Sequence, residues 1–231
     1  MTQQEWSALF PFHFGSVIER QARLTLRRDG DGDGDGDGDR GELEAFIHAR
    51  FESIHHADVH HFLPELIGLQ DSHGRLIAAA GMRPASQGAL FLERYLDEPL
   101  EGVVSRLAGR AVAREQLVEV GNLAALSAGS ARVIITAVTW LLAARGLQWV
   151  AFTGASTLVN SFHRLGLEPT VIAEADPQRL NGEMASWGSY YAQHPLVYAG
   201  NIGYGHDELE RTGVYKRMGF PMLLQETGHA A

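Results

Sequence analysis

The sequence predicts a mixed α/β domain in which helices cover both faces of a twisted sheet. Two observations lead to this prediction. Short apolar runs typical of strands alternate along the chain with segments whose apolar residues recur every three or four positions. In addition, the chain has 231 residues, of which 45% are apolar and 20% charged, and this is enough for a sizeable buried core.

The first half of the chain is expected to begin with a strand over residues 17–27, where apolar and polar residues alternate imperfectly; a short helix is the alternative. Residues 29–41 alternate aspartate and glycine, cannot bury a face, and are expected to form a disordered loop. Apolar spacings of three and four predict a helix over residues 42–53. The turn sequence DSHG separates two apolar runs, 65–70 and 76–82, and predicts a β-hairpin.

The second half alternates helices and strands more regularly. The expected elements are a helix over 99–109, a strand over 116–126, a helix over 131–145, a strand over 148–153, a helix over 157–165 and a strand over 169–173. The helix over 131–145 is apolar on nearly all sides, which predicts a central position. The strand before it carries Gly121, and a glycine inside a strand often marks a bulge.

Composition excludes several classes of protein. The net charge is −9, but six of the acidic residues are the aspartates of residues 29–39, so there is no basic footprint for nucleic acid. The absence of cysteine excludes disulfides and thiolate metal sites. The longest nearly apolar stretch, residues 133–144, is too short to span a bilayer, and Glu5 stands where a secretory signal needs positive charge. We therefore expect a cytoplasmic protein without stable membrane insertion.

Two patterns resemble metal sites. Residues 31–42 fit the carboxylate spacing of a twelve-residue calcium loop, as most Asp-Gly repeats do. A group of four histidines, with His56 and His60 at the spacing of metal ligands on one helix face, suggests zinc; the four are His55, His56, His60 and His61. Neither pattern is specific on spacing alone, and we expect no metal.

A turn of small residues, Ser127 to Ala131, follows a buried strand and opens a helix. Backbone N–H groups at such a turn are free and lie at the positive end of the helix dipole, which suits a phosphate. The alternative is an ordinary strand-to-helix turn.

Five ordered blocks of sequence resemble the thermostable hemolysin family, which belongs to the GNAT acyltransferase superfamily. The blocks are LFLERYLDEPLE (90–101), EVGNLAAL (119–126), FTGASTLVNSFHRLGLEP (152–169), RLNGEMASWGSYY (179–191) and HPLVYAGNI (194–202). The resemblance implies a GNAT-like fold whose sheet splays between two central parallel strands. The resemblance runs from about residue 45 to about residue 202, and we expect one domain over residues 1–202, followed by a C-terminal tail over 203–231.

The activity that the resemblance implies is transfer of an acyl group to a small-molecule amine. The co-substrate would be acyl-CoA or the phosphopantetheine of an acyl carrier protein. Gly129-Ser130-Ala131 looks like the superfamily's acyl-thioester loop, although Leu126 stands where Gln or Arg is usual. Phe162 stands where many members carry the tyrosine that protonates the leaving thiolate. The segment YKRMGF at residues 215–220 fits the tyrosine pattern better but lies after the matched blocks.

If the chain transfers acyl groups, three roles need residues. Glu119 is the candidate base, with a structural carboxylate paired to an arginine as the alternative. Backbone N–H groups at Gly121 and Asn122 are candidate oxyanion donors. Tyr190 is a candidate acid in place of the missing tyrosine; the alternatives are Tyr191, a water molecule, or a carrier-protein thiolate that leaves unassisted. The residues expected to contact the thioester are Gly121, Leu123, Ser127, Gly129, Ser130, Ala131, Arg132 and Asn160.

Two other functions remain open from the sequence. The family takes its name from red-cell lysis, so the protein could be a lytic factor that acts on membranes directly. It could also be a non-catalytic protein that binds an acyl thioester.

Overall fold

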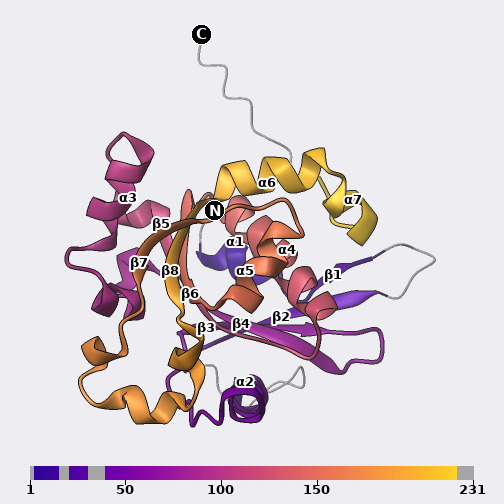
Figure 1. Ribbon diagram of the computed structural model, residues 1–231. Helices are drawn as coiled ribbons and strands as arrows, with labels where there is room; N and C mark the ends of the chain where they lie inside the picture. The colour runs from indigo at the N-terminus through magenta and orange to yellow at the C-terminus, as the bar shows by residue number, and fades with distance from the viewer. Residues whose placement is uncertain (1–2, 16–20, 31–39, 223–231) are drawn as a thin grey trace.

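The structure is a computed structural model that describes residues 3–15, 21–30 and 40–222 (Figure 1). Its centre is an eight-stranded sheet with the order β1-β2-β3-β4-β5-β6-β8-β7. Neighbouring strands are antiparallel except β5 and β6, which are parallel. The strands are β1 (Phe12–Phe14), β2 (Ala22–Arg28), β3 (Glu65–Gln70), β4 (Leu76–Pro84), β5 (Leu117–Ala125), β6 (Trp149–Gly154), β7 (Thr170–Glu174) and β8 (Leu196–Asn201).

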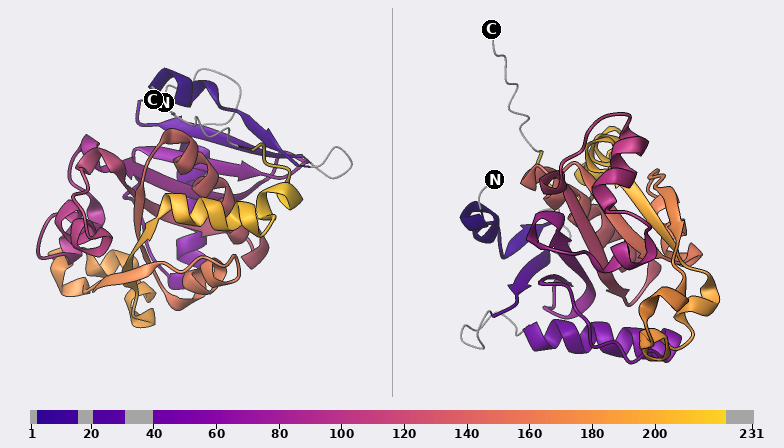
Figure 2. Two further views of the ribbon diagram at one scale, coloured as in Figure 1. Left: turned by 90° about the horizontal axis from the view of Figure 1, so that it is seen from above. Right: turned by 90° about the vertical axis from the view of Figure 1, so that its left-hand side faces the viewer.

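Helices cover both faces of the sheet, and the predicted mixed α/β fold is confirmed. The helices are α1 (Gln3–Ala8), α2 (Arg40–His55), α3 (Leu100–Ala108), α4 (Ala128–Arg145), α5 (Ser156–His163), α6 (Ile202–Arg211) and α7 (Val214–Met218). On one face, α4 contacts the strands while α5, α6 and α7 pack against α4; α2 covers the other face (Figures 1 and 2). Because it is enclosed in this way, α4 fully buries Ile134, Ala137 and Leu141.

The N-terminal third differs from the sequence prediction at its boundaries. The strand expected over residues 17–27 corresponds to β2, and residues 16–20 lie outside the described residues. Residues 31–39, which hold most of the Asp-Gly repeat and most of the calcium-like pattern, also lie outside them. The loop expected to continue to residue 41 is wrong at its end, because α2 already begins at Arg40. The Arg40 guanidinium donates to the carbonyls of Leu63 and Pro64, both at 3.1 Å, and these tertiary contacts are not visible in the sequence.

The segment after residue 202, expected to be a tail, packs onto α4 over its described part. The side chain of Leu209 is fully buried, and those of Tyr215 and Phe220 are almost so. The indole Nε1 of Trp140 on α4 donates to the Pro221 carbonyl at 2.9 Å. These contacts make residues 203–222 part of the same hydrophobic core as the sheet.

The sheet splays between β5 and β6, as the resemblance implied. Their parallel pairing covers only Leu117–Val120 against Trp149–Phe152. Beyond Val120, β5 continues to Ala125 and stays paired with β4 alone. A gap therefore opens in the middle of the sheet, and the candidate site lies there.

Candidate active site

A cavity of about 420 Å³ occupies the gap between β5 and β6. It reaches both faces of the sheet: Phe51 and His55 of α2 line one end, and Ile135 and Leu142 of α4 line the other. A ligand in this cavity would therefore pass between the two strands where their ladder is broken.

A β-bulge shapes the strand on one side of the gap. Ala79 pairs with Ala124 and Gly81 with Gly121, so Asn122 and Leu123 together oppose the single residue between Ala79 and Gly81. Asn122 has φ +51°, in the left-handed region that asparagine tolerates better than most residues. The bulge turns the backbone of residues 121–123 toward the cavity, which all three residues line.

The side chain of Asn122 is already engaged within the fold. Its Oδ1 accepts the backbone N–H of Leu63 at 2.9 Å, and its Nδ2 donates to the carbonyl of His61 at 3.0 Å. A β-carbon at Gly81 would come within 2.8 Å of Asn122 Oδ1, so glycine is needed on the facing strand. Asn122 thus fixes the 61–63 loop against the bulge, and only its backbone remains for chemistry.

Glu119 lies on β5 just before the gap and lines the cavity although only 4% of it is exposed. Its carboxylate accepts backbone N–H groups from Phe91 at 2.8 Å and Leu92 at 2.9 Å. Burial raises its pKa to about 7, and the two backbone donors only partly oppose that rise. The alternative interpretation was a carboxylate paired with an arginine. Among the described residues, the Glu119 carboxylate is held by these two backbone N–H groups and forms no ion pair with an arginine.

Aromatic side chains wall the cavity on the α2 side of the sheet. Trp187 lies with its ring 5.8 Å from that of Phe91 and 5.5 Å from that of Tyr190, and all three line the cavity. Burial raises the pKa of Tyr190, which therefore stays protonated at neutral pH. Tyr95 and Tyr191 also line the cavity but hydrogen-bond each other through their hydroxyls. Within the described residues, the Tyr190 hydroxyl has no hydrogen-bond partner, so of these three tyrosines it is the one whose hydroxyl is available to a ligand.

The other end of the cavity is largely apolar, with Thr139, Asn201 and Tyr204 as polar lining residues, and it was not predicted from the sequence. It lies between α4, β6 and the start of α6, and its wall holds Ile135, Val138, Leu142, Val150, Leu167 and Ile202. A branch of this composition suits a hydrocarbon chain, since burying each methylene contributes about 0.8 kcal/mol.

The N-terminus of α4 is partly capped. Ser127 Oγ accepts the Ser130 N–H at 3.1 Å, and Ser130 Oγ accepts the Ser127 N–H at 3.0 Å. The Ala131 N–H donates to the Ser127 carbonyl at 2.9 Å, so the expectation that the N–H groups of this turn are free is wrong at Ser127, Ser130 and Ala131. The N–H groups of Ala128 and Gly129 have no acceptor among the described residues, and two donors remain at the positive end of the helix.

The predicted site residues divide into two groups. The cavity is lined by Glu119, Gly121, Asn122, Leu123, Ser127, Ala131 and Tyr190. It is not lined by Gly129, Ser130, Arg132 and Asn160. Of the second group, Gly129 and Asn160 are exposed, whereas the Ser130 side chain is buried by its capping role. These residues surround the N-terminal end of α4 or lie on the outer face of α5.

Phe162 occupies the wall of the cavity, stacked on Phe152 with ring centres 4.7 Å apart. Tyr215, from the segment that fits the tyrosine pattern better, instead hydrogen-bonds His206 Nδ1 at 3.0 Å and lies outside the lining. The structure therefore places Phe162, and not Tyr215, beside the gap.

The chain is similar to one family and to several solved structures. A family model described as "Thermostable hemolysin" matches residues 34–206. The fold is similar to the AHL synthase LasI, with a TM-score of 0.56 and 10% identity over 89% of this chain and 99% of that chain. It is also similar to FeeM, an N-acyl amino acid synthase from uncultured soil microbes, with a TM-score of 0.55 and 12% identity over 86% and 100% of the two chains.

A further similar structure is BjaI, a CoA-dependent acyl-homoserine lactone synthase solved with SAM and isopentyl-CoA. Its TM-score is 0.51, at 14% identity over 79% of this chain and 85% of that chain. No curated protein matches the sequence. These neighbours are acyl-transferring synthases by their titles, and at such identities they establish the fold. Among the described residues, no helix has the length and apolar character needed to cross a membrane.

Proposed function

This chain belongs to the thermostable hemolysin family, and we propose that it is an acyltransferase that moves an acyl group from a thioester to the nitrogen of a small-molecule amine. The donor would be acyl-CoA or an acyl carrier protein. The observation that carries the proposal is the cavity through the split sheet, with Glu119 buried in its wall beside the β5 bulge.

Glu119 has the properties of a general base for an amine. A carboxylate with a pKa of about 7 is ionised in half of the molecules at neutral pH, and it is more basic than an exposed glutamate. Its two backbone donors hold it in one orientation at the cavity wall. Fixed orientation and a matched pKa are what proton abstraction requires.

The reaction balances with the groups present. The amine nitrogen attacks the thioester carbonyl, the C–N bond forms, and Glu119 takes the proton that the nitrogen loses, directly or through a water molecule. Backbone N–H groups at Gly121 and Asn122 would stabilise the oxyanion. The C–S bond then breaks and the thiolate takes a proton from Tyr190 or solvent, leaving an amide and a free thiol.

The two ends of the cavity would hold different parts of the substrates. The apolar branch beside Ile135 and Leu142 would hold the acyl chain, and the aromatic wall at Trp187 and Tyr190 would hold the amine. The N–H groups of Ala128 and Gly129 would bind a phosphate of the donor. Gly129, Ser130, Arg132 and Asn160 lie outside the cavity, so any contact they make would be with that outer part of the donor.

A second candidate is a non-catalytic protein that binds an acyl thioester. Phe162 favours it, because a phenylalanine beside the gap cannot protonate a leaving thiolate. Such a protein would bind donor in the cavity without consuming it.

The test is to incubate the purified full chain with acyl-CoA and acyl carrier protein donors and a panel of amines, and to search for N-acyl products by mass spectrometry. Released thiol can be followed with a thiol reagent without background, because the chain has no cysteine. An amide that requires both donor and amine supports the proposal. Donor binding without product on the whole panel supports the second candidate, and dye leakage from liposomes with no donor present supports direct lysis.

A further inference from the structure

Three side chains with metal-ligand atoms converge beside the C-terminal half of α2. His48 lies on α2, and Asp58 and His60 lie on the segment that follows it. Each imidazole Nε2 contacts the same oxygen, Asp58 Oδ1, at 2.9 Å from His48 and 2.7 Å from His60. It is the one group of three or more histidine or acidic side chains that converges in this way within the described residues.

We propose that His48, Asp58 and His60 form a binding site for a divalent transition-metal ion such as zinc. The inference is independent of the acyl-transfer proposal. It also differs from the set suggested by the sequence, His55, His56, His60 and His61. In the structure His55 and His61 line the cavity, and only His60 of that set joins the cluster.

The three side chains need to move little to bind a metal ion. The three ligand atoms lie within 4.8 Å of one another. In a tetrahedral zinc site with bonds of about 2.0–2.2 Å, ligand atoms lie roughly 3.4 Å apart. Small rotations about side-chain bonds would therefore place an ion between the two nitrogens and the carboxylate oxygen.

The backbone around the cluster is held in place by the fold. His56 has φ +52°, which reverses the chain after α2 and brings Asp58 and His60 back beside His48. The Asp58 N–H donates to the Ser186 carbonyl at 2.6 Å, and the Ser189 N–H donates to the His55 carbonyl at 2.7 Å. A β-carbon at Gly188 would come within 2.1 Å of His55 O, so the two segments are tightly apposed. The backbone that carries Asp58 and His60 is therefore held beside α2 by hydrogen bonds and close packing.

The donor set selects the class of ion. Two imidazoles and one carboxylate suit zinc and other late first-row ions, whereas calcium and magnesium prefer sites made of oxygen alone. The side chains of Asp58 and His60 are 69% and 74% exposed, so water would complete the coordination. A site of this kind binds its metal reversibly.

Metal binding would tie the wall of the cavity to α2. The segment that carries Asp58 and His60 continues to His61 and Leu63, which hold the Asn122 side chain. An ion shared with His48 would therefore stabilise the loop that supports the bulge. Because the metal would bind only the folded chain, it should raise the midpoint of thermal unfolding.

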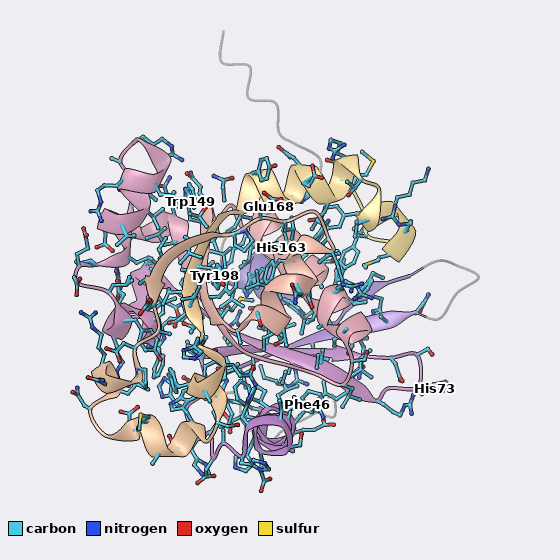
Figure 3. The ribbon with its side chains drawn as sticks, viewed as in Figure 1. Phe46, His73, Trp149, His163, Glu168 and Tyr198 are labelled. Atoms are coloured by element: carbon cyan, nitrogen blue, oxygen red, sulfur yellow. The ribbon has the colours of Figure 1, made fainter. Side chains whose placement is uncertain are left out.

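The test is calorimetric titration of zinc into the full chain after treatment with a chelator, using the variants H48A, D58A and H60A. His73→Ala is the matched control, because His73 is exposed at the far end of the β3–β4 hairpin, away from α2 (Figure 3). We expect one zinc per chain, an affinity at least about tenfold weaker in each of the three variants, and no change in the control. Cobalt should give visible absorption bands that the same variants lose.

Circular dichroism shows which variants fold. If H48A does not, D58A and H60A still test the site, because both side chains are exposed. The proposal is overturned if the wild-type chain shows no saturable zinc binding up to about 100 µM. It is also overturned if the folded variants bind zinc as tightly as the wild-type chain, or if H73A weakens binding equally.

Discussion

Glu119 on β5 holds the backbone of Phe91 in place: its carboxylate accepts the Phe91 N–H at 2.8 Å, and its other oxygen accepts the next N–H along the chain. The candidate base is therefore also the anchor of an aromatic side chain that lines the same cavity. Experiments on Glu119 must separate its chemistry from this anchoring role.

Glu119→Gln should reduce turnover by roughly 10²- to 10⁴-fold, the usual contribution of a general base. In the wild-type chain, kcat/KM should rise as pH rises through about 7, because burial raises the pKa of Glu119 to that value and only the carboxylate accepts a proton. The variant should lack this inflection. Rates measured from pH 5.5 to 9 check both expectations.

The control for that experiment is Glu115→Gln, since Glu115 is exposed just before β5 and outside the cavity lining. It should keep the wild-type rate and pH profile. Full turnover in E119Q, or an unchanged inflection near pH 7, would remove Glu119 as the base.

Glu119 should also make stability depend on pH in a defined direction. Its folded pKa, about 7, lies above its ordinary value of 4.5, so the folded state favours the protonated form. The resulting stabilisation is full below pH 4.5 and is lost as pH rises to 7. Urea unfolding at pH 5 and pH 8 should show wild type losing roughly 2 to 3 kcal/mol relative to E119Q over that interval. Parallel pH dependences of the two proteins would contradict the raised pKa.

Asn122 should stabilise the folded state in two ways: its side chain makes two hydrogen bonds, and asparagine tolerates the positive φ of this position. Asn122→Ala removes the hydrogen bonds to Leu63 and His61 and leaves a β-carbon at φ +51°, so we expect destabilisation by about 2–4 kcal/mol. Asn122→Gly loses the same bonds without the backbone strain and should be about 1 kcal/mol more stable than the alanine variant. Urea unfolding measures both, and equal stabilities would show that the bulge does not depend on this conformation.

Much of the fold was predictable because its signals are local. Apolar periodicity located α4 and β5 within a few residues, and glycine in β5 correctly marked the bulge, which the structure centres one residue later at Asn122. β8 was not predicted as a strand, although its sequence belongs to a matched block. It pairs with β6 and β7 through long-range contacts that periodicity does not report.

The sequence predicted single residues of the site, but it did not predict which residues from distant segments contact them. Glu119 could be selected because a carboxylate inside an apolar strand is unusual. Its partners are the backbone N–H groups of Phe91 and Leu92, and the sequence gives no signal for which backbone groups a distant carboxylate contacts. The same holds for His48 and Asp58, which meet only because the chain reverses at His56.

Phe162→Tyr should increase turnover if protonation of the leaving thiolate limits the rate. The ring lies in the cavity wall, stacked on Phe152, so a hydroxyl can be added without removing that contact. We expect kcat to rise by up to about tenfold, with a larger effect for poorer leaving groups. The kcat values for two thioesters of different thiol pKa check this, and equal rates in both proteins for both donors would exclude thiolate protonation as the limiting step.

The most direct test of the whole account is a crystal structure of the full chain with a non-hydrolysable acyl-CoA analogue. We expect the carbonyl analogue in the gap between β5 and β6, within hydrogen-bond distance of the backbone at Gly121 or Asn122. We expect the acyl chain between α4 and β6, beside Leu142. A ligand bound elsewhere on the molecule, or a gap closed by side chains between the two strands, would contradict it.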